Sequence, residues 1–305
     1  MKIISIIGGT GLIGTRLVES LLSSGYGVRL FVRSPDSAQG KFDAKVEIIE
    51  WKADVEYLSK YLNDNFGIIN LAGAPLAGAK WTTDYKKEII QSRTETTSLI
   101  VNAIEMTAAT PKILINASAI GIYGSQGTKF LNEKSDFGND FLAEVCKAWE
   151  HEALKAHSKT RVVILRIGIV LSNKGGALEK LLMPFKLFIG GALGDGKQYW
   201  SWIHIDDLVA IFTYALINDT MSGVYNAVAP NPVQVGDFAK ILGKVMSRPS
   251  FFKVPKFVLK ALLGESAEMV LSSQYVSSHK ITEKGFLFKF PILEESLEDL
   301  LKNYR

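Results

Sequence analysis

The sequence is poor in cysteine and has no long apolar run, and these two absences exclude several classes of protein. Its 305 residues include a single cysteine, Cys146, so no disulfide can form within the chain, which fits a reducing compartment. No stretch approaches the roughly 20 apolar residues that a membrane-spanning helix needs. The apolar run after Lys2 soon ends in glycines, and no small-residue cleavage site follows, so we expect a cytoplasmic protein.

Strong charge is also missing. The net charge is only +4, and the lysines and arginines are spread along the chain, which argues against a nucleic-acid partner. His151, His157 and His279 have no partners at the spacing of metal ligands, and we predict no metal site. The expected partner is therefore a small molecule, with no nucleic acid and no membrane, and the chain is expected to be a monomer or a homodimer.

What the sequence does contain is a glycine-rich turn after its first apolar run. The run Ile3–Ile7 predicts a buried strand, and a helical pattern begins at Leu12. Such a turn lets the backbone approach a pyrophosphate at the positive end of the helix. The alternative is a strand–turn–helix without a ligand. The predicted cofactor-binding residues of this turn are Gly8, Thr10, Gly11, Leu12, Ile13 and Gly14.

Strand-like and helical patterns then alternate through the first two-thirds of the chain. This alternation predicts an α/β protein, a Rossmann-type doubly wound parallel sheet covered on both faces. The expected strands are Val28–Val32, Val46–Ile49, Gly67–Leu71, Lys112–Ala117 and Val162–Ile167, and the expected helices include Leu12–Ser23, Asp84–Met106 and Phe141–Ala156.

The alternation ends after Ile169. Glycine-rich loops follow, of which Gly190–Gly196 is either a flexible lid or a cluster of turns. Short helices separated by Pro249 and Pro255 are expected next, and a final amphipathic helix over Leu293–Asn303. We predict a nucleotide-binding domain over residues 1–168, to which 202–228 returns, and a smaller C-terminal substrate lobe from 169–201 and 229–305.

The residue after the second strand distinguishes the two common dinucleotides. An acidic residue there accepts a hydrogen bond from the ribose of NAD, whereas an arginine accommodates the 2′-phosphate of NADP. Here Arg33 comes first, with the hydroxyl of Ser34 beside it, and a guanidinium binds phosphate well. We therefore predict NADP(H), with Arg33 and Ser34 as phosphate ligands. Asp36 would favour NAD if the end of the strand were shifted toward it. The remaining alternative is that Arg33 is a surface residue without a ligand.

Several motifs in order give the chain a resemblance to a known family. With the glycine turn it resembles the extended short-chain dehydrogenases/reductases, and within them the atypical branch labelled "epimerase family protein". The resemblance implies an NADP-binding domain, cofactor contacts from Ala72 and Gly73, and hydride transfer at a sugar carbon. The segments that carry it are Asn70–Gly73, Gln91–Thr94, Ser118–Gly124, Lys174–Leu178, Met183–Lys186, Ser201–Asp207 and Lys284–Phe288.

The catalytic set of that family is incomplete here. The resemblance implies a Ser or Thr after the fifth strand, then a Tyr with a Lys four residues later. None of the ten tyrosines is followed by a lysine at that spacing. When the expected helix is aligned with the family pattern at Glu150, the Tyr position falls at Leu142 and the Lys position falls at Cys146. Ser118 and Tyr123 remain as catalytic candidates, and Tyr123 is equally well read as a pocket wall.

Three further residues are candidates for substrate binding. Arg93 would bind an acidic group or a diphosphate, or else form a structural ion pair. His204 would act as an acid or base, or else be a hydrogen-bonded residue at a helix start capped by Asp206 or Asp207. Trp81 would stack on a ring or fill the core.

Two functions follow from these residues. The first is an NADP(H)-dependent oxidoreductase or epimerase-like protein, and an epimerase would be an isomerase. Its substrate would be an unidentified polar molecule that is sugar-like or nucleotide-linked. The second is a catalytically weak NADP(H)-binding sensor or partner-binding protein, which the missing Tyr/Lys pair favours.

Overall fold

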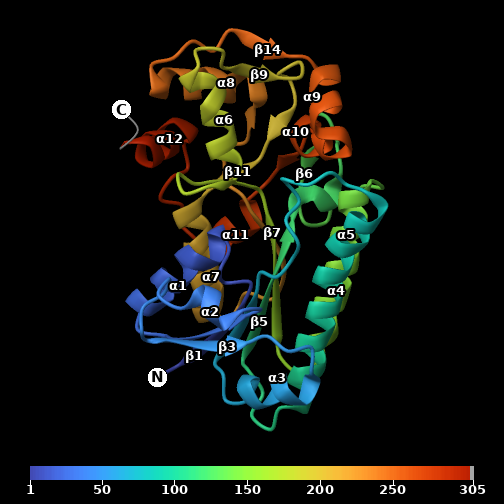
Figure 1. Cartoon of the computed structure of the whole chain (residues 1–305), viewed down its shortest axis with the longest axis vertical. Helices are drawn as coiled ribbons and strands as arrows, with labels where there is room; N and C mark the ends of the chain where they lie inside the picture. The colour runs from blue at the N-terminus through green and yellow to red at the C-terminus, as the bar shows by residue number, and fades with distance from the viewer. Residues whose placement is uncertain (303–305) are drawn as a thin grey trace.

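The computed structural model describes residues 1–302, apart from the side chain of Ser37, and is built around one parallel sheet (Figure 1). Asn303, the predicted end of the last helix, lies outside these residues. The sheet has seven strands in the order β12-β7-β5-β4-β1-β2-β3, and every neighbouring pair is parallel. The strands are β1 (Ile3–Ile7), β2 (Gly27–Val32), β3 (Val46–Glu50), β4 (Gly67–Asn70), β5 (Ile113–Ala119), β7 (Arg161–Ile167) and β12 (Gly223–Ala227).

Helices cover both faces of this sheet, which confirms the predicted doubly wound fold. One face is buried by α1 (Leu12–Ser23) and α7 (Ile205–Ile217), which share a core with apolar residues of β1, β2, β5 and β7. The other face is buried by α3 (Val55–Leu62), α4 (Thr83–Met106) and α5 (Phe141–Leu154), followed by the 3-10 turn η2 (Lys155–Ser158). The strands and helices predicted between residues 3 and 167 all form, with ends displaced by at most two residues.

The strand order reverses beside β1. The chain runs from β1 to β2 and β3 in one direction, and later strands extend from β4 in the other. In open sheets of this kind, ligands bind beyond the carboxyl ends of the strands at the reversal. The glycine turn after β1 and the segment after β4 both lie at this position.

The remaining elements build a second lobe beyond that edge, drawn in the upper part of Figure 1. Its helices are α6 (Gly176–Lys186), α8 (Val235–Met246), α9 (Lys256–Leu263), α10 (Glu268–Leu271) and α12 (Leu293–Leu301). Its small paired strands are β8 (Ile169–Leu171) with β11 (Trp202–His204), β9 (Gly191–Leu193) with β14 (Phe252–Val254), and β10 (Tyr199–Trp200) with β13 (Val233–Gln234). Short elements complete the chain: α2 (Pro35–Ala38), η1 (Ile120–Tyr123), β6 (Phe130–Leu131), η3 (Gly264–Ala267), β15 (Tyr275–Val276) and α11 (His279–Glu283).

Two expectations for this lobe need correction. The loop Gly190–Gly196 is neither a lid nor only turns, because Gly191–Leu193 pairs with β14. The approach is so close that a Cβ on Gly191 would lie 1.8 Å from the Phe252 carbonyl oxygen. The segment between Pro249 and Pro255 is a strand rather than a helix.

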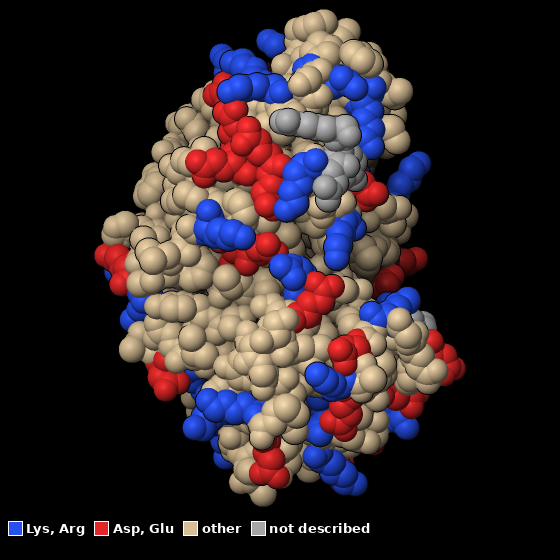
Figure 2. All heavy atoms as spheres, turned by 90° about the vertical axis from the view of Figure 1, so that its left-hand side faces the viewer, with Lys and Arg blue, Asp and Glu red and all other residues tan. Residues whose placement is uncertain are grey.

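The surface carries both signs of charge. On the face that includes α1 and α12, lysines and arginines are interspersed with aspartates and glutamates (Figure 2). Within residues 1–302, no helix is both long and apolar enough to cross a membrane. The same residues contain no group of three or more His, Cys, Asp or Glu side chains that could hold a metal ion.

Candidate functional site

The glycine turn after β1 has the geometry of an anion cradle. Gly8 adopts a φ of 80°, and a Cβ there would lie 2.7 Å from the Leu71 carbonyl carbon, so the backbones touch. Gly11 is the N-cap of α1 without a side-chain hydrogen bond, and the first turn of the helix contains no acid. The amide groups at this helix start therefore have no side-chain cap, and they favour a bound anion.

The space above the turn is open. A Cβ added to Gly11 would have one neighbour within 4 Å, the Gly8 carbonyl oxygen at 3.6 Å. At Gly14, by contrast, a Cβ would lie 2.3 Å from the Gly9 Cα, which shows how tightly α1 packs on the turn. Thr10, Gly11 and Leu12 border a cleft, whereas Ile13 packs against the core. The residues present thus fit a pyrophosphate on the turn.

The predicted nucleotide-selecting residues follow β2 directly. Val32 ends the strand, and Arg33 is exposed and forms no ion pair within residues 1–302. Ser34 is the N-cap residue of α2, and Asp36 lies in the first turn of that helix. The register therefore puts the arginine, not the acid, next to the strand end.

Ala72 and Gly73 follow β4 at the other side of the reversal. The side chain of Asn70 holds this segment, because its Oδ1 accepts a hydrogen bond from the Ala72 amide at 3.1 Å. The same side chain donates to Thr97 of α4 and to Asn116 of β5. The buried amide thus joins β4, β5 and α4 where the cofactor contacts were predicted.

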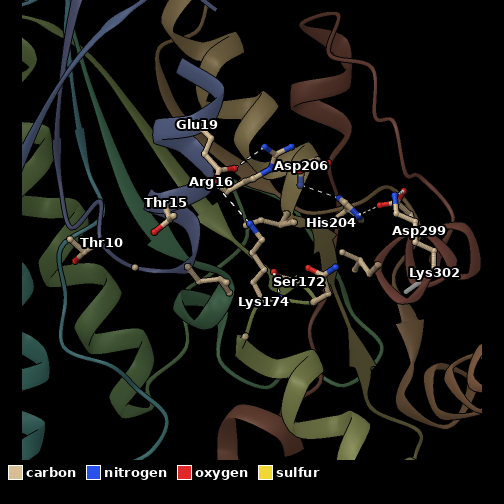
Figure 3. A pocket seen from close by; sticks show the side chains of 16 residues that line it. Thr10, Thr15, Arg16, Glu19, Ser172, Lys174, His204, Asp206, Asp299 and Lys302 are labelled. Atoms are coloured by element: carbon tan, nitrogen blue, oxygen red, sulfur yellow. Dashed lines mark hydrogen bonds and ion pairs between the residues drawn. The ribbon is translucent and has the colours of Figure 1, made fainter. Parts of the chain in front are cut away.

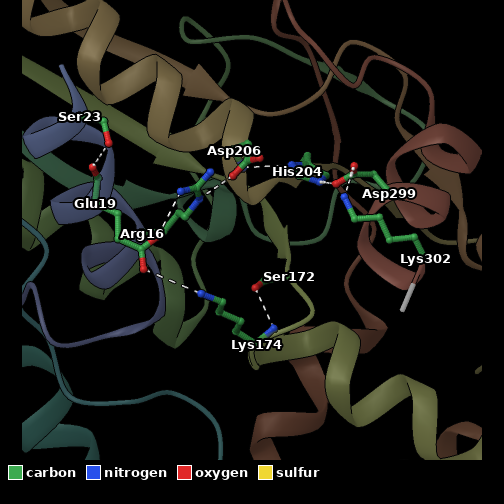
Figure 4. A network of polar contacts seen from close by, with 9 residues as sticks. All are labelled: Arg16, Glu19, Ser23, Ser172, Lys174, His204, Asp206, Asp299 and Lys302. Atoms are coloured by element: carbon green, nitrogen blue, oxygen red, sulfur yellow. Dashed lines mark hydrogen bonds and ion pairs between the residues drawn. The ribbon is translucent and has the colours of Figure 1, made fainter. Parts of the chain in front are cut away.

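An outer cleft of about 520 Å³ separates α1 from the second lobe (Figure 3). One wall is the glycine turn with α1, and the other contains residues 172–175, the start of α7 and α12. Polar side chains cross it in series (Figure 4). The contacts run from Lys174 to Glu19 (3.8 Å), from Glu19 to Arg16 (3.1 Å), from Arg16 to Asp206 (2.8 Å) and from His204 to Asp299 (3.4 Å).

His204 lies on the wall of this cleft but is 1% exposed. Its Nδ1 accepts a hydrogen bond from the Asp206 amide at 3.0 Å, so the histidine itself caps α7. The expectation that Asp206 or Asp207 caps this helix was wrong. Asp207 instead accepts hydrogen bonds from the backbone amides of Lys289 and Phe290. Burial lowers the pKa of His204, against the effect of nearby carboxylates.

Ser118 and Tyr123 belong to a buried polar network rather than to a cavity. Glu150 of α5 and Arg166 of β7 form a bidentate ion pair, with both N–O distances at 2.8 Å. Ser118 Oγ donates to Glu150 at 2.7 Å. The Tyr123 hydroxyl donates to Asn226 at 2.7 Å and accepts from Arg166 at 2.9 Å.

The two interpretations of Tyr123, as a catalytic residue and as a pocket wall, therefore need correction. Its side chain is 0% exposed and packs in a core cluster with Ile122, Leu131 and Val276. Burial raises the pKa of Tyr123 to about 12. Ser118 is 3% exposed, and neither side chain lines the outer cleft or the inner pocket described next. A phenol that is fully enclosed and weakly acidic is poorly suited to exchange a proton with a substrate.

A second, inner pocket of about 230 Å³ lies where η1 and α5 meet the second lobe. Leu142 and Cys146 line it, so the two positions that the family gives to Tyr and Lys do face a cavity. Burial raises the pKa of Cys146 to about 11, so the thiol stays neutral. Arg93 and Trp149 also line this pocket, 5.1 Å apart from guanidinium carbon to ring centroid.

Trp81 lies beside the inner pocket. It is 7% exposed, its Nε1 donates to the Leu76 carbonyl at 2.9 Å, and its ring packs against Phe141. Leu76 lines the pocket, so Trp81 supports the wall from behind. The structure thus brings Arg93 and Trp81 into one neighbourhood, and His204 into another.

Glu150 and Arg166 are the main residues that the motifs missed. Arg166 interrupts the apolar strand Arg161–Ile167, and Glu150 lies among buried residues of α5. Charged side chains on otherwise buried surfaces are normally paired, and this signal was available in the sequence.

A sequence profile of the "NAD dependent epimerase/dehydratase family" matches residues 4–227 of this chain. The chain belongs to this family. A further profile, a domain of unknown function, matches residues 254–300, which include α9 to α12. The family match extends from the first strand to the end of β12, and it includes both walls of the strand-order reversal.

Relatives that match nearly the whole of this epimerase/dehydratase chain include the epimerase family protein SDR39U1 homolog, chloroplastic, of Arabidopsis thaliana. It is 42% identical over 98% of this chain and 86% of its own length. The crystal structure of human epimerase family protein SDR39U1 (isoform 2) with NADPH has a TM-score of 0.90 at 32% identity, over 99% of both chains. The UDP-N-acetylglucosamine 4-epimerase from Bacillus cereus, at 18% identity and a TM-score of 0.79, shares the fold.

We predict that breaking the buried ion pair strongly destabilises the domain. Glu150→Gln should lower the free energy of unfolding by about 3–5 kcal/mol, because it leaves the Arg166 charge without its counterion. Glu47→Gln is the matched control, since Glu47 pairs with Arg29 at 2.8 Å but is 48% exposed. Its cost should stay below about 1 kcal/mol. Urea unfolding followed by circular dichroism measures both, and equal costs would contradict the prediction.

We also predict that His204 makes stability depend on pH. Its pKa is lower in the folded chain than in the unfolded chain, so the unfolded state binds the proton more readily. The stabilisation is thus fully present above the unfolded value of about 6.5 and is lost as the pH falls below it.

Melting temperatures between pH 8 and pH 5 test this prediction. His204→Asn keeps a side chain that can cap a helix, and it should show a shallower decline than the unmodified protein. Parallel declines would show that other groups cause the pH dependence.

Proposed function

We propose that this chain binds NADP(H) and acts as an oxidoreductase or epimerase-like enzyme on a small polar substrate. The observation that carries the proposal is the open, uncapped glycine turn at the start of α1. It agrees with the crystal structure of the human relative, which is a structure with NADPH. The cofactor, when bound, would supply or accept a hydride.

Arg33 supports NADP(H) over NAD(H). It follows the last residue of β2 and forms no ion pair within residues 1–302, so its guanidinium is available for a 2′-phosphate. Ser34 adds a hydroxyl at the neighbouring position. Asp36 is displaced into α2 and does not replace the arginine at the strand end.

The remaining chemistry of the chain concerns substrate positioning. The inner pocket has apolar walls from Leu76, Leu142 and Trp149, and polar groups from Arg93 and Gln274. Ser118 and Tyr123 are committed to the Glu150–Arg166 network, so neither serves as the proton donor of this proposal. A substrate whose own groups exchange the proton suits this pocket best.

The missing proton donor also favours the second function, a cofactor-binding sensor with little turnover. The two functions share the glycine turn and Arg33, and they differ in whether the inner pocket binds a substrate that is transformed.

Gly11→Val should abolish NADPH binding without unfolding the domain. The added side chain would fill the space above the turn, where the protein itself offers room, and would block the approach of the pyrophosphate. Calorimetric titration with NADPH and a far-ultraviolet dichroism spectrum test the two halves of this prediction. A folded variant with normal NADPH affinity would remove the turn from the cofactor site.

Arg33→Ala should weaken NADPH binding and leave NADH binding nearly unchanged. Loss of a charge-assisted hydrogen bond to the phosphate costs about 1.5–3 kcal/mol. Arg248→Ala, another exposed arginine but in the second lobe, is the matched control and should change neither affinity. Equal affinity of the unmodified protein for NADPH and NADH would overturn the assignment of NADP(H).

A further inference from the structure

The inner pocket contains a buried cation without a counterion. Arg93 is 8% exposed, and it forms no ion pair with a carboxylate within residues 1–302. Its Nη1 donates to the Ile89 carbonyl at 2.9 Å and its Nη2 to the Ala74 carbonyl at 3.1 Å. These neutral acceptors use two of the five N–H groups that a guanidinium carries.

The surroundings hold this guanidinium in a fixed position. The guanidinium lies over the Trp149 ring and also close to Gly73, where a Cβ would be 2.7 Å from the guanidinium carbon. Burial lowers the pKa of Arg93, and no neighbouring carboxylate contributes to offset it. The side chain is nevertheless charged, because arginine keeps its proton in proteins.

Another buried arginine shows what such a charge usually requires. Arg166 is 2% exposed and is matched by the bidentate carboxylate of Glu150. A buried charge without a partner is costly, and proteins normally pair it or place it toward a ligand. Arg93 lines a cavity, whereas Arg166 does not. The missing counterion of Arg93 is therefore expected from the occupant of the pocket.

The size and charge of the pocket limit the class of that occupant. A volume of about 230 Å³ is below the roughly 300–1,000 Å³ of drug-sized ligand pockets, which disfavours a complete nucleotide-linked sugar. Asp140 and Glu268 also border the pocket. Asp140 is engaged as the N-cap of α5, and Glu268 is exposed. These two carboxylates at the pocket disfavour a ligand with two negative charges. The planar guanidinium of Arg93 matches the geometry of a single carboxylate.

We propose that the inner pocket binds a small monocarboxylic acid, with Arg93 as its anchor. The proposal deepens the proposed function, on which it rests for the assumption that the pocket adjoins bound NADP(H). It makes Arg93 a specificity-determining residue and favours a small acid over a nucleotide-linked sugar as the substrate.

Titration of the full chain with pyruvate tests the proposal. Binding is followed by ligand-observed NMR and calorimetry, with and without NADPH, and acetate, malonate, inorganic phosphate and UDP-glucose are compared. Pyruvate should bind more tightly than malonate, phosphate or UDP-glucose. Arg93→Gln should weaken pyruvate binding about tenfold or more, and Arg93→Lys, which keeps the charge but not the planar fork, should fall between. Arg248→Gln should change nothing.

Three results would overturn the proposal: no monocarboxylate binding, tighter binding of phosphate or UDP-glucose than of pyruvate, or unchanged pyruvate affinity in Arg93→Gln. If Arg93 were purely structural, Arg93→Gln would lower the melting temperature as far as Glu150→Gln does. Arg93→Lys would then leave the affinity for pyruvate unchanged. NADPH affinity is also measured in Arg93→Gln, Arg93→Lys and Arg248→Gln, so that an effect on the cofactor site is separated from an effect on the inner pocket. If the unmodified protein does not bind NADPH, the proposed function is contradicted. The pyruvate titration without cofactor then still tests whether the inner pocket binds a monocarboxylate.

Discussion

The ion pair between Glu150 and Arg166 is the contact on which the carboxyl edge of the sheet depends. It joins α5 to β7, and through the hydroxyls of Ser118 and Tyr123 it reaches β5, η1 and, at Asn226, β12. Every member of this network is 5% exposed or less. Two opposite charges in a buried interior depend on each other, because either one alone would be severely destabilising. The network therefore ties together five elements at the edge of the sheet below the inner pocket.

This constraint explains how the chain differs from the pattern that its family implies. The hydroxyls that would exchange protons have become structural donors and acceptors, and the helix positions of the usual Tyr and Lys are Leu142 and Cys146 on the pocket wall. The charge available to a ligand comes instead from Arg93 on α4. If Arg93 anchors the substrate as proposed, recognition depends on α4, beside the α5 positions where the family pattern has its Tyr and Lys.

Local patterns were sufficient to predict the elements and the fold. Leu12–Ser23 has the predicted bounds, because an uncapped glycine and the Ser24-Gly25 turn delimit a regular apolar periodicity. Side-chain directions were not predictable in the same way. Tyr123 lies in a 3-10 turn, where spacing does not define a buried face, and its partner Asn226 is 103 residues away. The pairing of Gly191–Leu193 with β14 depends on contacts that no short segment encodes.

The series of charged side chains across the outer cleft has a consequence for how the protein is made. Arg16 and Asp206 are separated by 190 residues, and the series ends on α12, which follows all the other described elements. Contacts between such distant segments form late, since a long loop must close first. During synthesis the nucleotide-binding sheet can fold as its strands emerge, because domains generally assemble from the N-terminus. The second wall of the cleft beside its phosphate cradle is complete only after α12 has been translated, so a nascent chain presents the cradle before the cleft is fully formed.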